Sequence, residues 1–96
     1  MIIYIAGPIS SDTCYKARFD AAAREIEADG DIPLNPAWQP LGLEYKQYID
    51  NALAMLRQAD AAVFLPGWES STGARLEHLY CETVGIPIIF DDKEDF

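Results

Sequence analysis

Short apolar runs alternate along the chain with longer stretches in which apolar residues recur every three or four positions. The short runs are bounded by glycine, proline or aspartate, as buried strands often are, and they cover 2–6, 31–35, 61–65 and 86–90. The longer stretches have the spacing of amphipathic helices and cover 15–29, 44–59 and 72–84. The pattern therefore predicts strands and helices in strict alternation.

Such alternation predicts a parallel sheet with right-handed crossovers and helices on both of its faces. We expect an α/β fold, a Rossmann- or flavodoxin-like three-layer sandwich, whose four-stranded parallel sheet has the order 2-1-3-4. Pro87 would remove a ladder hydrogen bond from a central strand, so the last strand is placed at an edge. Residues 1–90 are expected to form a single domain, with 91–96 as a loose acidic tail, and Asp12 or Thr13 is suited to cap the first helix.

The third predicted helix carries a carboxylate on its packing face. At about 100° per residue, Glu77 falls near the middle of the apolar arc of 72–84, whereas His78 falls on the opposite, polar face and is expected to be solvated. An unpaired buried charge is costly, so Glu77 needs an explanation. It is satisfied by buried partners such as Tyr4, or it acts as a nucleophile or base on a bound ligand.

The predicted strand order puts a topological switch between the first and third strands, where parallel sheets bind ligands at the carboxyl ends. Those ends carry the loops 7–9 and 66–68, and the helix start at Ser71 lies beside them. Ser71 either caps an ordinary helix or, with the bare first turn behind it, holds an anion. Trp38 and Trp68 lie in loops at the same edge, where each either stacks on a flat base or packs over the rim of the sheet.

Composition narrows the classes of partner. A net charge of −9 argues against a nucleic-acid surface, and no apolar run approaches the ~20 residues that cross a membrane. The apolar run at the start lacks a basic segment before it, so we expect no signal peptide. Cys14 and Cys81 are expected to be buried thiols of a cytoplasmic protein, and the single histidine predicts no metal site. We expect no cofactor.

Four segments, taken in order, carry a family resemblance: Tyr4-Ile5-Ala6-Gly7-Pro8, Asn35-Pro36-Ala37, Ala59-Asp60 and Ser71-x-Gly73-x-x-x-Glu77. Their order and spacing resemble the nucleoside 2-deoxyribosyltransferase superfamily. The variant Leu65-Pro66-Gly67-Trp68-Glu69 is similar to a branch of small, often phage-encoded proteins of unassigned function. The resemblance implies that 1–90 is a nucleotide-binding domain.

The resemblance also implies roles for individual residues. Glu77 matches a nucleophile that attacks the anomeric carbon of a nucleoside, and Tyr4 matches the tyrosine that orients it. Ser71 matches the serine that meets the phosphate in relatives that hydrolyse deoxynucleoside 5′-monophosphates. The candidate ligand-binding residues are Gly7, Pro8, Ile9, Asn35, Trp38, Pro66, Gly67, Trp68, Ser71, Gly73 and Ala74.

One position departs from the family pattern. The aspartate that assists protonation of the leaving base would stand eight residues before Asp60, where this chain has Ala52. Asp50 lies two residues away, about 200° around the helix, and is a poor substitute. Two functions therefore stay open: an N-glycosidase or deoxyribosyltransferase, and a non-catalytic binder that sequesters a nucleotide or an ADP-ribose-type signalling molecule, as in phage counter-defence. A third alternative is an oligomeric structural domain. For the first two functions we expect a nucleoside or nucleotide partner. We also expect a homodimer or higher homo-oligomer through the second and third helices.

Overall fold

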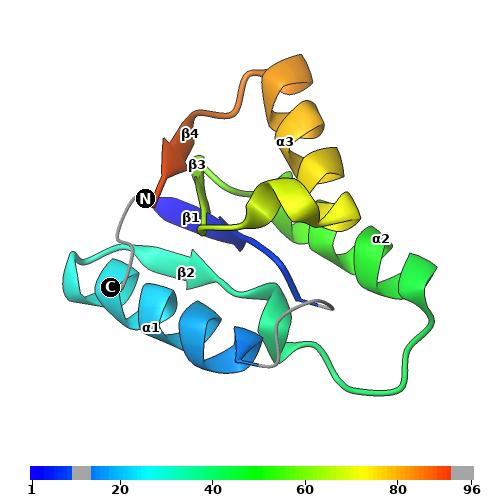
Figure 1. The fold of residues 1–96 in the computed structure, drawn as a ribbon. Helices are drawn as coiled ribbons and strands as arrows, with labels where there is room; N and C mark the ends of the chain where they lie inside the picture. Colours follow the sequence, from blue (N-terminus) through cyan, green and yellow to red (C-terminus); the bar gives the residue numbers. More distant parts are fainter. Residues whose placement is uncertain (10–13, 92–96) are drawn as a thin grey trace.

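The computed structural model describes residues 1–9 and 14–91, and within them the predicted alternation of strands and helices is confirmed (Figure 1). The sheet is entirely parallel and has the predicted order, β2-β1-β3-β4. The elements are β1 Ile2–Ala6, α1 Tyr15–Ala28, β2 Ile32–Leu34, the 3₁₀ turn η1 Pro36–Trp38, α2 Tyr45–Leu56, β3 Ala61–Phe64, the 3₁₀ turn η2 Trp68–Ser70, α3 Thr72–Val84 and β4 Ile88–Phe90.

The sheet separates two apolar cores, because successive side chains of a strand point to opposite faces. Ile3 and Ile5 of β1 pack with the buried face of α1, and Tyr4 and Ala6 pack with α2 and α3. Figure 1 shows the same layering, with α1 on one side of the sheet and α2 and α3 on the other. The central strand is therefore buried on both faces, as its uninterrupted apolar run predicts.

The outer strands are shorter than the sequence predicts. Strand β4 begins at Ile88, after Pro87, and lies at the edge of the sheet where the proline was expected to place it. Helix α3 ends at Gly85, whose φ of 86° is a left-handed conformation that favours glycine. The predicted caps Asp12 and Thr13 and residues 92–96 of the acidic tail lie outside the described residues.

Two predicted environments are wrong. Cys14 is exposed, because it lies at the N-terminal boundary of α1 and not on the helix's inner face, whereas Cys81 is buried as expected. His78 is half-buried instead of solvated, since the indole of Trp68 stacks on its ring at a centroid distance of 4.5 Å. The first error concerns where a helix begins and the second a loop that folds over a helix, and helical periodicity reports neither. Among the described residues, no helix combines the length and the apolar character that crossing a membrane requires.

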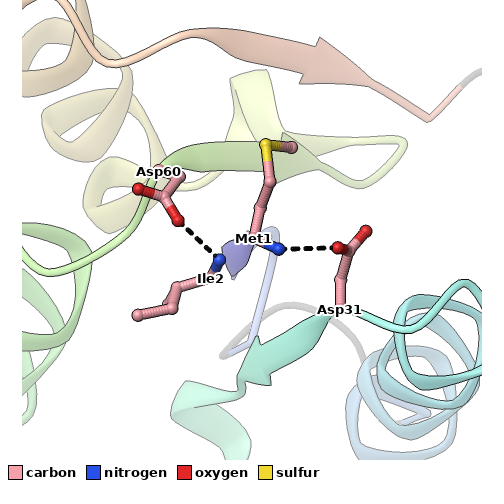
Figure 2. A network of polar contacts seen from close by, with 4 residues as sticks. All are labelled: Met1, Ile2, Asp31 and Asp60. Carbon is pink, nitrogen blue, oxygen red and sulfur yellow. Dashed lines mark hydrogen bonds and ion pairs between the residues drawn. The ribbon is translucent and has the colours of Figure 1, made fainter.

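Two carboxylates fix the start of the central strand (Figure 2). Asp60 Oδ2 accepts a hydrogen bond from the backbone N–H of Ile2 at 2.8 Å, and the Met1 ammonium donates to Asp31 Oδ1 at 2.7 Å. The backbone N–H of Asp60 donates in return to the carbonyl of Ile2 at 2.7 Å. Asp60 thus satisfies the first amide of β1 and aligns β1 with β3.

Removing the carboxylate of Asp60 should weaken this alignment. We expect Asp60→Ala to lower the free energy of unfolding by about 1 kcal/mol, since the Ile2 amide loses its acceptor. Asp60→Asn keeps an oxygen acceptor and should lose less. Urea denaturation measures both, with Asp50→Ala on the exposed face of α2 as the control. Equal losses in the alanine and asparagine variants would contradict the assigned hydrogen bond.

Candidate functional site

A cavity of about 480 Å³ lies at the carboxyl ends of β1 and β3, between α2, α3 and the segment that follows β2. Its position is the topological switch of the sheet, and its volume is within the ~300–1,000 Å³ typical of small-molecule sites. Seven of the predicted site residues line it: Tyr4, Gly7, Ile9, Ser71, Gly73, Ala74 and Glu77.

Tyr4 and Glu77 form the buried polar pair of this cavity. Helix α3 turns Ala74, Glu77 and Cys81 toward the sheet, at the spacing of a helix face, and Glu77 is only 6% exposed. Tyr4 comes from the central strand and is fully buried, and its hydroxyl donates a hydrogen bond to Glu77 Oε2. The carboxylate that the sequence placed on a packing face is thus buried there, with a donor from the sheet.

Burial sets the protonation states of this pair. Loss of hydration raises the pKa of Glu77 from 4.5 to about 7, although the hydrogen bond from Tyr4 lowers it in part. Burial and the neighbouring Glu77 carboxylate raise the pKa of Tyr4 well above 10. Tyr4 therefore keeps its proton and donates it in a hydrogen bond, while Glu77 titrates near neutral pH.

Cys81 lies one turn beyond Glu77 and does not supply a thiolate. Burial and, second, the Glu77 charge raise the pKa of the Cys81 thiol to about 11. A thiol that holds its proton at neutral pH is a poor nucleophile. In the part of the chain that is described, no group of three histidine, cysteine or acidic side chains is arranged to hold a metal ion.

The N-terminus of α3 opens onto the same cavity. Ser71 is its N-cap, and the Ser71 Oγ accepts a hydrogen bond from the backbone N–H of Ala74 at 3.2 Å. A methyl group on Gly73 would come within 3.2 Å of Ile49 Cδ1 and 3.6 Å of the Tyr45 hydroxyl oxygen, so the bare glycine lets α2 pack closely against the first turn of α3. The first N–H groups of a helix lack intrahelical acceptors and carry partial positive charge, which suits an anion.

Gly7 is required by a close approach of two strand ends. A Cβ at this position would lie 3.0 Å from Leu65 Cβ and 3.4 Å from Phe19 Cζ, which is tighter than most side-chain contacts in proteins. A side chain at Gly7 would therefore push the chain leaving β1 away from the end of β3. This contact brings the two loops of the switch point together.

The loop 66–68 lies away from the main cavity. Pro66, Gly67 and Trp68 line a second, smaller hollow with the end of β4, and Trp68 packs on His78 and on the ring of Phe90 at 5.9 Å. Pro8 is not part of the main cavity's lining either. A ligand contact from any of these four residues stays a prediction, and the structure gives Trp68 the rim-packing arrangement that was its alternative.

Asn35 and Trp38 do not line the cavity, but they flank Pro36 and Ala37, which do. The side chain of Asn35 is buried, accepts from the backbone N–H of Ala37 at 2.9 Å and donates to Asp20 Oδ1 at 3.2 Å. The indole N–H of Trp38 donates to the same oxygen at 3.1 Å, while its ring is 60% exposed. Asp20 thus ties η1 to α1. Contact of Asn35 or Trp38 with a ligand stays a prediction.

Most of one wall of the cavity lies outside the predicted ligand-binding residues, although the resemblance pointed to the position of Ala52. It comes from 39–43 and from the inner face of α2, where the cavity is lined by Gln39, Leu41, Leu43, Tyr45, Tyr48, Ile49 and Ala52. The Tyr48 hydroxyl holds this wall together, since it donates to the carbonyl of Pro40 at 2.7 Å and accepts from the N–H of Leu43 at 3.3 Å. The helical spacing of the α2 residues was visible in the sequence, but it indicated packing and not a ligand site.

Known structures share this fold. The chain is similar to the 2-deoxyribosyltransferase from the psychrotolerant bacterium Bacillus psychrosaccharolyticus, with a TM-score of 0.76 and 19% sequence identity. The superposition covers 100% of this chain and 77% of that chain. At this identity the likeness establishes the fold, and the predicted resemblance to deoxyribosyltransferases is confirmed at that level.

Sequence comparison adds the family. No curated protein matches the chain. A family model described as a domain of unknown function, DUF4406, matches residues 1–90. The chain therefore belongs to the DUF4406 family and has the fold of a 2-deoxyribosyltransferase.

Proposed function

We propose that the cavity binds a nucleoside 5′-monophosphate and that Glu77 acts on its N-glycosidic bond. The observation that carries this proposal is a buried carboxyl group with a pKa of about 7, held by Tyr4 in a cavity onto which the N-terminus of α3 opens. The helix start and the Ser71 hydroxyl suit a phosphate. Glu77 follows Ser71 on the same helix, so the sugar next to that phosphate lies near the carboxylate.

In this proposal the ionised Glu77 attacks the anomeric carbon of the sugar. A bond forms between a carboxylate oxygen and that carbon, while the bond to the base nitrogen breaks and its electron pair leaves with the base, which takes up a proton. Water then attacks the glycosyl ester, gives a proton to the solvent, and releases the sugar phosphate and the Glu77 carboxylate. A second base in place of water gives transfer. Tyr4 is a positioning residue, since its hydroxyl orients Glu77 Oε2.

Ala52 favours a second candidate, a binder without turnover. Ala52 lines the cavity and is 7% exposed, and its methyl group has no proton to give to a leaving base. Loss of general acid assistance alone typically costs ~10²–10⁴-fold in rate. Such a protein retains the phosphate and sugar contacts and sequesters a nucleotide or an ADP-ribose-type signalling molecule.

The outer faces of α2 and α3 support the proposed homodimer. Tyr45 is 63% exposed and Leu79 is 59% exposed, which leaves apolar surface on both helices. In a two-fold symmetric dimer, this apolar surface of one copy would pack against the same surface of the other copy. Because Tyr45 also lines the cavity, the partner would lie close to the bound ligand.

Base release tests the enzymatic proposal. We expect the wild-type protein to release free base from deoxynucleoside monophosphates, and Glu77→Gln to reduce the rate by about 10³-fold or more, because the nucleophile is lost. Chromatography of the free base measures both rates. Glu82→Gln, on the outer face of α3, is the matched control and should retain activity. Tight stoichiometric binding by calorimetry with no release from any nucleotide would contradict the enzyme and support the binder.

The protonation of Glu77 predicts a pH dependence of stability that needs no ligand. Because folding raises this pKa from 4.5 to about 7, the group's contribution is fully present below pH 4.5 and is lost as the pH rises through about 7. We expect the wild-type free energy of unfolding, relative to Glu77→Gln, to fall by roughly 2–3 kcal/mol between about pH 5 and 8. Urea titrations at both pH values measure it. Tyr4→Phe, which removes the hydrogen bond that lowers the pKa, should extend the fall to higher pH, because only the folded pKa changes. A difference independent of pH would refute the assignment.

Sedimentation tests the dimer. We expect a mass of about twice the 10.7 kDa of the chain. Leu79→Lys should shift the population to monomer, because it places a charge in the proposed interface, whereas Ala17→Lys on the exposed side of α1 should leave it unchanged. A wild-type mass equal to that of one chain would exclude the interface.

A further inference from the structure

One polar atom of the cavity wall has no role in the fold. Gln39 lines the cavity, and its side-chain oxygen Oε1 is buried without a hydrogen-bond partner among residues 1–9 and 14–91. Buried polar atoms in folded proteins are almost always paired, and the exceptions concentrate where a ligand, ion or water completes them. Neither the phosphate contacts nor Glu77 of the proposed function uses this atom.

The fold determines which atom of the Gln39 carboxamide has no hydrogen-bond partner. Nε2 donates to the backbone carbonyl oxygen of Tyr48 at 3.4 Å. Turning the amide over would set its oxygen against that carbonyl oxygen, so the nitrogen faces Tyr48 and the oxygen remains as an acceptor. The residues after Gln39 are also held in place, since the Tyr48 hydroxyl donates a hydrogen bond to the Pro40 carbonyl and accepts one from the Leu43 N–H. The segment that carries Gln39 is therefore held in place, while its carboxamide is restrained by a single long hydrogen bond.

The location of Gln39 in the cavity suits the base of a nucleotide. Ser71 and Glu77 both come from α3, so in the proposed function the phosphate and the sugar lie along that helix. Gln39 belongs to the other wall, which Leu41, Leu43 and Tyr48 make largely apolar. An apolar wall that carries a single polar side chain is an arrangement by which pockets bind a flat ring and select its edge.

We propose that Gln39 Oε1 accepts a hydrogen bond from an amino group on the base, so that the cavity selects amino bases over their oxo counterparts. An oxo base presents a carbonyl oxygen where the amino base presents N–H, and two acceptors then face each other. Because the bond to Tyr48 is long, a small turn of the carboxamide brings the buried oxygen to the cavity surface. This inference rests on the proposed function and names the substrate class within it.

The test compares bases that differ in this group and in the ring nitrogen beside it, which carries a proton in the oxo form. Calorimetry on the full chain measures the dissociation constants of dAMP against dIMP and of dCMP against dUMP. We expect the wild-type protein to bind at least one amino member about tenfold tighter than its oxo counterpart, and Gln39→Met to bring that ratio within about twofold, mainly by weakening the amino member. The melting temperature of the ligand-free variant should change little, since the removed oxygen was unpaired and the Nε2 hydrogen bond that is lost with it is long.

Two further variants separate base reading from packing. Gln39→Leu also removes the acceptor but has a different shape, so it should lower the ratio as far as Gln39→Met does. Gln58→Met, at the exposed end of α2 where the side chain donates only to the carbonyl of Ala54, is the matched control and should leave the ratio at its wild-type value.

The outcomes distinguish this inference from the proposed function. A wild-type protein that binds nucleotides without preferring an amino member, or a Gln39→Met ratio equal to that of wild type, overturns the role of Gln39 and leaves nucleotide binding intact. The wild-type comparison needs no variant, so it decides the matter even where a substitution prevents folding. Absence of binding by all four nucleotides overturns this inference together with the proposed function.

Discussion

The buried hydrogen bond between Tyr4 and Glu77 joins the central strand to the third helix and places a carboxyl group inside the molecule. Glu77 loses its hydration there, and one hydroxyl donor offsets only part of that loss, which is why its pKa rises to about 7. The protein therefore carries a group that destabilises the fold once it ionises. The surrounding structure tolerates it because Tyr4 lies on the strand that is buried on both faces and paired on both edges.

The same strand order that buries this pair also creates the cavity above it. Chains leave β1 and β3 at adjacent points and diverge to opposite faces of the sheet, and the missing side chain at Gly7 lets them pass closely. The start of α3 and the segment after β2 then close the remaining sides. A cavity at this position is a consequence of parallel topology, and it needs no particular chemistry from the residues around it.

A binder and an enzyme that use this cavity would differ in only a few atoms. Binding a phosphorylated sugar needs the helix start and a cavity of suitable size, both of which are present. Turnover also needs a carboxylate that ionises and a proton for the leaving base. Glu77 supplies the first requirement near neutral pH, whereas Ala52 supplies nothing toward the second. Both candidate functions therefore use the same binding contacts and differ only in whether the leaving base receives a proton.

The sequence by itself determined the alternation of strands and helices and the burial of Glu77, because both follow from the spacing of neighbouring residues along one element. The edge position of the last strand follows from the amide hydrogen that Pro87 lacks. The sheet order was an expectation for such an alternating chain, and the structure confirms it. Only the tertiary structure decided that Trp68 stacks on His78, that Asp20 gathers Asn35 and Trp38, and that Gln39 and Tyr48 form a cavity wall. Those contacts lie between loops and other elements, so periodicity within one element cannot report them. Cys14 shows the same limit, since its exposure depends on where a helix begins and not on which face it presents.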